Sequence, residues 1–263
     1  MTAVRRRPSA LVLVAAALGT TFLVLPVIGL VRQAPWARLG TILTEPAATA
    51  ALRLSLVCSL AAAALAVVLG LPLAWALAHV PMRGRALLRG FVLLPMVLPP
   101  VVGGVALLSA FGRQGIVGGP LYDHLGVQLT FTTAGAILAE TFVALPFFVI
   151  TVEAGLRSID PRHAEAATTL GASPAYVFRR VTLPLVAPSL LAGTALAWAR
   201  AIGEFGATIT FAGNVEGRTQ TLPLAVYLEL QNDPDTAVAL SVVLLGLSLA
   251  VLALLRDRWL MSS

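Results

Sequence analysis

Six long apolar runs dominate the pattern of hydrophobic and polar positions along the chain. They cover about residues 10–31, 54–78, 90–112, 132–152, 183–211 and 236–255. Each run approaches the roughly 20 residues with which an α-helix crosses the hydrocarbon core of a bilayer. The pattern therefore predicts an all-α, polytopic membrane protein with six transmembrane helices. Because no Gly/Ser-rich linker or shift in composition interrupts it, we interpret residues 1–263 as a single transmembrane domain.

Prolines mark the third run as unusual. It contains Pro95, Pro99 and Pro100. A proline within a span frees a backbone carbonyl, which then needs protein or water nearby as a hydrogen-bond partner. We therefore expect the third run not to form a straight, lipid-facing helix.

A charged and polar segment, residues 160–184, separates the fourth run from the fifth. Asp160 and Ser173 are each followed by proline, as is typical of helix N-caps, and Gly171 suits the left-handed position that ends a helix. We expect two short helices joined by a sharp turn, the second over about residues 175–180. An amphipathic helix on the membrane surface is the alternative. The first helix argues against it, because alanine fills most of its positions and leaves no broad apolar face.

The composition supports the membrane assignment and narrows the function. Hydrophobic residues make up 58% of the chain and charged residues only 11%, too few to cover a water-soluble domain. The net charge of +6 is therefore no indication of a nucleic-acid partner, and membrane lipid is the expected surrounding. Every basic residue is arginine, so the chain lacks a P-loop, whose lysine contacts the nucleotide phosphates. We expect no ATP hydrolysis by the chain itself.

Signatures of catalysis and of cofactor binding are missing from the sequence. The single cysteine, Cys58, excludes an intrachain disulfide and a multi-thiolate metal site. The histidines are scattered, and neither a nucleophile–base arrangement nor an HExxH motif is present. The sequence therefore predicts neither an enzyme nor a chain that binds a metal or cofactor of its own.

The placement of arginine predicts the orientation in the membrane. With the N-terminus inside, twelve of the 18 arginines fall on the cytoplasmic side, five fall outside, and Arg200 lies within a span. Because cytoplasmic loops carry the excess of basic residues, both termini and the 160–184 segment are expected in the cytoplasm. Arg5, Arg6 and Arg7 before the first run would also suit a secretory signal, but that run is long for one and no soluble domain follows it.

The fifth run contains most of the candidate functional residues. Small residues recur at every fourth position, a stripe that would let a neighbouring helix approach closely; they are Ala195, Ala199, Gly203 and Ala207. One position on, Arg200, Glu204 and Thr208 form a parallel stripe. Charges within a span face protein or a wet cavity rather than lipid. Arg200 and Glu204 either neutralise one another or take part in passing an anion, and Glu140 in the fourth run is either a partner of Arg200 or a gate residue.

Part of the 160–184 segment resembles a known motif. Glu165-Ala166-Ala167, Gly171 and Val181-x-Leu183-Pro184 look like the EAA loop of ABC importer permeases, although Val181 stands where that pattern usually has isoleucine. The resemblance implies a fold like that of type I ABC importer permeases. It also implies that this loop is the coupling helix that docks into a cytoplasmic ATPase, and the coupling residues it indicates are Glu165, Ala166, Ala167, Gly171 and Ala172.

Two further stretches are similar to molybdate importer permeases of the ABC class: Leu94 to Gly115, and Ala197 to Tyr227. The resemblance implies a permease of the bacterial inner membrane that imports molybdate or tungstate and forms the translocation pathway, with Arg200, Glu204, Thr208 and Glu140 as candidate pathway residues. It further implies a second copy of the chain, ATPase subunits that use ATP and Mg²⁺, and an extracytoplasmic oxyanion-binding protein. A sulfate or thiosulfate ABC permease is the main alternative, because sulfate permeases tend to have Tyr-Gly-Ser where Phe205-Gly206-Ala207 stand here. A secondary anion transporter is a more distant one.

Overall fold

The computed structural model describes residues 9–259, and within that range the ordered elements are helices. They are α1 (Ala10–Gln33), α2 (Leu39–Thr44), α3 (Pro46–His79), α4 (Arg85–Val97), α5 (Pro100–Phe111), α6 (Gly118–Leu125), α7 (Thr133–Ser158), α8 (Arg162–Thr169), α9 (Pro174–Val177), a π-helical turn (Phe178–Thr182), α10 (Leu183–Ile202), α11 (Gly206–Ala212), α12 (Leu222–Asn232) and α13 (Pro234–Trp259). The prediction of an all-helical polytopic protein is confirmed. In hydrocarbon only a helix or a closed barrel satisfies its own backbone hydrogen bonds.

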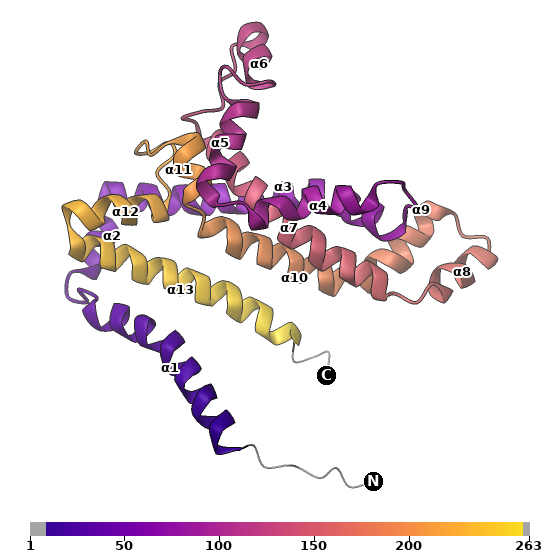
Figure 1. The fold of residues 1–263 in the computed structure, drawn as a ribbon, viewed down its shortest axis with the longest axis horizontal. Helices are drawn as coiled ribbons and strands as arrows, with labels where there is room; N and C mark the ends of the chain where they lie inside the picture. The colour runs from indigo at the N-terminus through magenta and orange to yellow at the C-terminus, as the bar shows by residue number, and fades with distance from the viewer. Residues whose placement is uncertain (1–8, 260–263) are drawn as a thin grey trace.

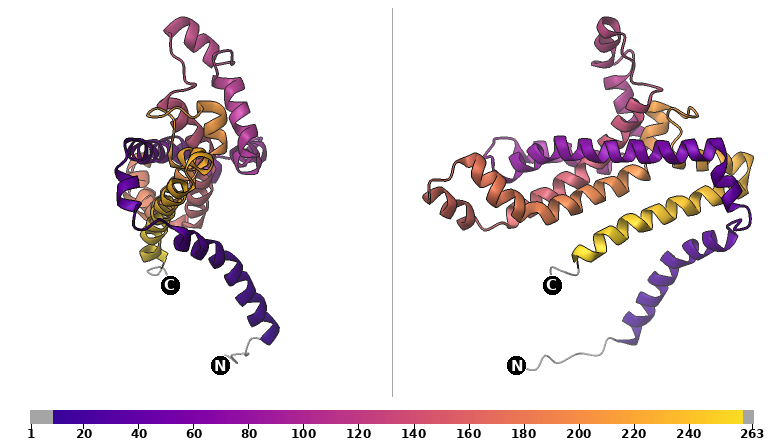
Figure 2. Two further views of the ribbon diagram at one scale, coloured as in Figure 1. Left: turned by 90° about the vertical axis from the view of Figure 1, so that its left-hand side faces the viewer. Right: turned by 180° about the vertical axis from the view of Figure 1, so that it is seen from behind.

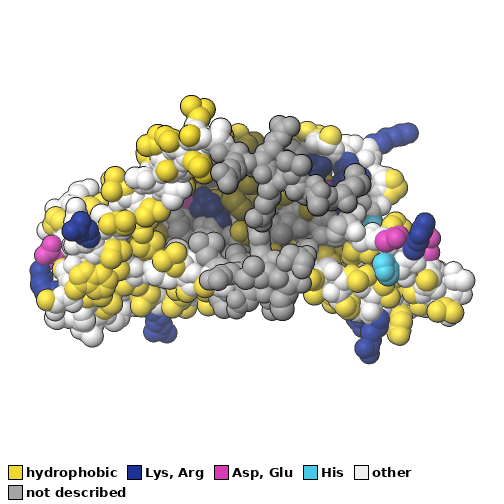
Figure 3. All heavy atoms as spheres, turned by 90° about the horizontal axis from the view of Figure 1, so that it is seen from below, with side chains coloured by type: hydrophobic (Ala, Val, Ile, Leu, Met, Phe, Trp, Pro, Cys, Tyr) yellow, Lys and Arg dark blue, Asp and Glu magenta, His cyan; other side chains and the backbone are white. Residues whose placement is uncertain are grey.

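A bundle of α3, α7 and α10 forms the body of the molecule (Figures 1 and 2). Its core contains Leu77, Phe148 and Leu156, together with small residues that let the helices approach closely. α8 and α9 lie at one end of the long axis, and α2 and α12 lie at the other. Figure 3 shows hydrophobic side chains over much of one face, with most of the visible acidic side chains near the two ends.

Within residues 9–259, five helices are long and apolar enough to cross a membrane, and the bent pair α4–α5 makes up to six. α1 runs toward the α12 end, α3 runs toward the α8 end, α4 runs away from it, α7 runs toward it, α10 runs away and α13 returns (Figure 1). The alternation matches six crossings. The second helix begins at Pro46, earlier than the expected start near residue 54, so that Arg53 lies within it.

The third run is broken, as its prolines predict. α4 and α5 meet at an angle of 119° around Leu98 and Pro99. A proline cannot donate the backbone hydrogen bond that would continue the helix, and the residue before it avoids helical geometry. Beyond the break, α5 and α6 project away from the bundle (Figure 2).

The fifth run does not form one helix to residue 211, and that prediction is wrong. α10 ends at Ile202, Gly203 to Phe205 leave the helix, and α11 begins at Gly206. A side chain accounts for the new start, because Glu204 Oε1 accepts a hydrogen bond from the backbone N–H of Ala207 at 2.8 Å. The carboxylate thereby satisfies one of the N–H groups that every helix start leaves without a partner.

The small-residue stripe lies two positions away from the predicted one. Gly193, Ala197 and Ala201 are the buried small residues of α10, whereas Gly203 is exposed. Ala207 is buried, but on α11. The prediction assumed that the helical repeat continues through residue 203, but the helix ends at residue 202.

At its other end, the fifth helix starts earlier than predicted. The expected short helix over residues 175–180 does not end before Pro184; α9, the π-helical turn and α10 follow one another without a gap. The wide π turn ends two residues before Pro184, which has no backbone N–H to donate to the preceding turn.

The two broken spans meet. A Cβ atom added at Gly206 would lie 2.5 Å from Pro100 Cβ, and one added at Gly104 would lie 2.5 Å from Thr210 Cβ. Such distances are shorter than side chains tolerate, so glycine is needed where α5 crosses α11. Irregular backbone at membrane depth is tolerated where protein or a water-filled cavity surrounds it. Here the two breaks lie against each other at Pro100 and Gly206, while Pro99 and Gly203 stay exposed.

Candidate functional site

The 160–184 segment has the two capped helices that the sequence predicts. Asp160 Oδ1 accepts from the backbone N–H of Arg162 at 3.0 Å, where α8 begins. Gly171 ends the first helix with φ of +83°, a left-handed conformation. Ser173 Oγ accepts from the N–H of Tyr176 at 3.3 Å and caps α9.

This segment presents a shaped surface to its surroundings. None of the α8 residues is buried: Glu165 and Ala166 are exposed, and Ala167 is half-buried. Ala172, directly after Gly171, is half-buried as well. Leu170, which no sequence pattern singled out, is 89% exposed beside the Gly171 turn. One large apolar side chain at the tip of an otherwise polar and alanine-rich helix suits docking into a protein cleft better than lying in lipid.

Arg200 and Glu204 form the ion pair that was one of the two expectations for them. Arg200 Nη2 lies 2.5 Å from Glu204 Oε2, and only 1% of the Glu204 side chain is exposed. They pair across the end of α10 and not along one continuous helix. Thr208 lies on α11, fully buried, and its hydroxyl has no hydrogen-bond partner. The predicted stripe of these three residues on one helix is therefore wrong.

A cavity of about 130 Å³ lies at the break of the third span, and Arg200 forms part of its wall. The other lining residues come from both sides of that break and from α7; they are Pro95, Met96, Leu98, Pro100, Gly103, Phe142, Val143 and Phe147. The Arg200 side chain is 28% exposed, so its guanidinium is paired with Glu204 without being sealed off.

Glu140 forms no ion pair with Arg200. It is 1% exposed, its Oε2 atom has no hydrogen-bond partner, and no ion pair joins it to Arg200 in the described residues. The option that Glu140 pairs with Arg200 is therefore wrong. Its role as a gate residue stays a prediction.

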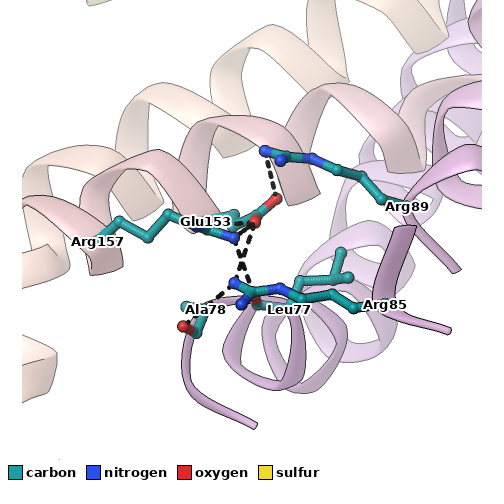
Figure 4. A network of polar contacts seen from close by, with 6 residues as sticks. All are labelled: Leu77, Ala78, Arg85, Arg89, Glu153 and Arg157. Carbon is teal, nitrogen blue, oxygen red and sulfur yellow. Dashed lines mark hydrogen bonds and ion pairs between the residues drawn. The ribbon is translucent and has the colours of Figure 1, made fainter. Parts of the chain in front are cut away.

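Figure 4 shows a polar cluster that was not predicted from the sequence, at the α8 end of the bundle. Glu153 on α7 is 1% exposed and lies within 4.0 Å of Arg85, Arg89 and Arg157. The available signal was an acidic residue near the end of an apolar run, four positions before an arginine. No three His, Cys, Asp or Glu side chains of the described residues are grouped so that they could hold a metal ion.

Comparison with known proteins assigns the chain to a family. The model of the family described as "Binding-protein-dependent transport system inner membrane component" matches residues 66–261. The chain belongs to this family. It is thus a multi-pass inner-membrane component of an ABC transporter that works with an ATPase and a periplasmic binding protein, and it is not itself the ATPase.

Two relatives and one solved structure refine the comparison. The molybdenum transport system permease protein ModB of Mycobacterium tuberculosis is 47% identical over 228 residues, which cover 86% of this chain and 85% of the relative. The sulfate transport system permease protein CysT of Salmonella typhimurium is 37% identical over 234 residues, covering 88% and 84%. A bacterial ABC transporter involved in alginate import has the same fold, with a TM-score of 0.72, 22% identity and 94% of each chain covered.

A substitution at Gly171 tests the docking surface. Gly171→Val forces a β-branched residue into a left-handed conformation, at a cost of roughly 1–2 kcal/mol, and should displace α8. We expect the variant to insert in the membrane at normal levels but to lose transport. The matched control is Gly246→Val, since Gly246 on α13 has ordinary φ and open space around it. Normal ATPase co-purification together with normal transport by Gly171→Val would refute this role.

A double-mutant cycle tests the Arg200–Glu204 pair. Arg200→Ala leaves the buried Glu204 carboxylate without its cation; removing one partner of a buried pair costs roughly 3–5 kcal/mol, so the thermal unfolding temperature should fall. Adding Glu204→Gln removes the charge, keeps an acceptor for the Ala207 N–H, and should restore much of that loss.

Transport by the double variant separates the two roles of Arg200. Normal transport shows that pairing is the whole role, whereas slow transport by a stable double variant shows that Arg200 also serves the anion. A single Arg200→Ala variant with native stability and activity contradicts both.

Proposed function

We propose that this chain is the permease subunit of an ATP-driven importer for molybdate, with the translocation pathway inside its own membrane domain. The observation that carries the substrate assignment is the 47% identity to a molybdenum permease, set against 37% to a sulfate permease over a similar length. The Phe205-Gly206-Ala207 sequence supports the same choice, since it lacks the Tyr-Gly-Ser that sulfate permeases tend to have.

The cavity at the broken spans is the candidate passage. A dianion in a low-dielectric environment needs compensating charge, and Arg200 is both in the cavity wall and partly exposed. The N-terminal end of α5, which carries partial positive charge, also lines the cavity through Pro100 and Gly103. Glu204, in the break before α11, supports this wall through its ion pair with Arg200, and Thr208 lies one turn further on, on α11.

The movement that couples transport to ATP hydrolysis would begin at the opposite end of the same helices. α8 docks in the cleft of the ATPase, with Glu165, Ala166 and Leu170 on its exposed surface. It is attached to α7 on one side and, through the Gly171 turn, to the α9–α10 helix on the other. Movement of α8 on ATP binding therefore acts on two of the three bundle helices.

The remaining partners follow from this arrangement. The α8 end faces the cytoplasm with both termini, Mg²⁺ and ATP are bound by the ATPase, and the oxyanion-binding protein docks on the α12 end. A second copy of the chain completes the passage, and the long exposed apolar helix α1 contacts that copy or lipid. A secondary transporter would need neither the ATPase nor the binding protein.

Reconstitution with the two partner proteins tests the function. Uptake of molybdate into vesicles should require ATP and the binding protein loaded with molybdate, because the chain has no P-loop of its own. Sulfate-loaded binding protein is the comparison. Stimulation of ATP hydrolysis by sulfate and none by molybdate would move the assignment to the sulfate branch.

A further inference from the structure

Three arginines converge on one buried carboxylate at the α8 end of the bundle (Figure 4). Glu153 Oε1 accepts from Arg157 Nη2 at 2.7 Å and from its Nε at 2.9 Å. Arg89 Nη2 lies 3.2 Å from Oε2, and Arg85 Nη2 lies 4.0 Å from Oε1. The arginines are between 34% and 48% exposed, whereas Glu153 is 1% exposed. We call these four residues the Glu153 cluster.

The cluster joins three helices by their ends. The last carbonyls of α3 accept from its arginines: Leu77 O accepts from Arg157 Nη2 at 3.2 Å and also from Arg85, and Ala78 O accepts from Arg85 Nη2 at 3.4 Å. Cations are favourable there, because a helix carries partial negative charge at its C-terminal end. Arg157 lies in the last turn of α7, where the same holds.

α4 differs from α3 and α7, because its arginines lie at the N-terminal end of the helix, where cations are unfavourable. Arg85 is its first residue and Arg89 follows one turn later, where the helix carries partial positive charge. Two guanidinium groups at this end repel each other and the helix start unless an anion lies between them. Glu153 is the one carboxylate that the ion pairs of the described residues place beside them.

Little else holds α4 to the bundle. Val92 is its one buried residue, and Leu88 packs on the core with part of its surface. An element with few buried apolar contacts moves at low free-energy cost. At its far end α4 runs into the break at Leu98, where Pro95, Met96 and Leu98 line the cavity that contains Arg200. The attachment of α4 at the cluster therefore decides whether α4 moves with α7.

We propose that Glu153 is a positioning residue for transport: it clamps α4 to α7 so that movement of α8 reaches the cavity. α7 ends at Ser158 and α8 begins at Arg162, so the cluster lies directly before the segment that docks the ATPase. Glu153 is buried, contacts arginines and is not among the residues that line the cavity beside Arg200. The inference rests on the proposed import function for its readout of transport, but not on the identity of the anion.

The first experiment compares transport with ATP hydrolysis in the reconstituted complex of permease and ATPase, with binding protein loaded with molybdate. Glu153→Gln keeps the side-chain volume and removes the charge. The complex should assemble and hydrolyse ATP on stimulation, while anion transported per ATP falls by about tenfold, a usual size for coupling between sites. Glu153→Asp, which keeps the carboxylate, should recover part of the ratio.

Two further variants keep this test decisive. Gly246→Val on α13, where an added side chain meets open space, lies outside the cluster and should leave the ratio unchanged. If Glu153→Gln fails to assemble, Arg89→Gln removes a half-exposed member of the cluster and should lower the ratio in an assembled complex. A ratio that stays native in an assembled Glu153→Gln or Arg89→Gln complex overturns the proposal, even if assembly or total activity declines.

A second experiment measures the clamp without any transported anion. Spin labels at Leu87 on α4 and Ser158 on α7, both exposed, report the distance between the two helices. Cys58 is fully buried and so should not compete for the label. In the native cluster the distance should stay narrow and unchanged between nucleotide-free and ATP-bound complexes, whereas Glu153→Gln should broaden it.

The two experiments separate the failures. A native complex that does not import molybdate refutes the proposed substrate, while the label distance still judges the clamp. A distance that is equally narrow in native and Glu153→Gln complexes overturns the clamp whatever the anion is.

Discussion

A backbone in hydrocarbon must satisfy its own hydrogen bonds, and the rest of this structure depends on that constraint. It explains why the described chain is helical and why the two interruptions of its spans lie against each other. α4 breaks from α5 at Leu98 and Pro99, α10 breaks from α11 at Gly203, and Gly104 and Gly206 let the halves touch. The backbone of each broken span therefore lies next to protein on one side. The small cavity beside Arg200 is a consequence of the same meeting.

The features that were predictable from the sequence are those with a local cause. Apolar runs indicated the spans, prolines indicated the break in the third span, and Asp160, Gly171 and Ser173 indicated the shape of the 160–184 segment. The features that were not predicted depend on residues distant in the sequence, or on a side chain whose hydrogen bond replaces continuation of the helix. The end of α10 at Ile202 follows from Glu204 bonding Ala207 in place of continuing the helix. The role of Glu153 depends on ion pairs with Arg85 and Arg89, more than sixty residues earlier.

Charge is concentrated where the chain has to act on something else. The exposed α8 surface, the Glu153 cluster and the Arg200–Glu204 pair follow one another from the α8 end toward the middle of the bundle. In the proposed mechanism the first receives the ATPase, the second keeps α4 with α7, and the third lies in the wall of the passage. A permease that leaves ATP hydrolysis to its partner needs little more polar chemistry than this.

Chemical access to the cavity tests most directly whether the broken spans form the passage. Leu98→Cys places a thiol in the cavity wall, and the native Cys58 is fully buried. A small anionic thiol reagent should modify this cysteine at a rate that changes between nucleotide-free and ATP-bound complexes, and modification should block uptake. Gly246→Cys on the outer face of α13 is the control and should leave uptake intact. A Leu98→Cys thiol that reacts in no nucleotide state, or whose modification leaves uptake unchanged, would contradict a passage through the broken spans.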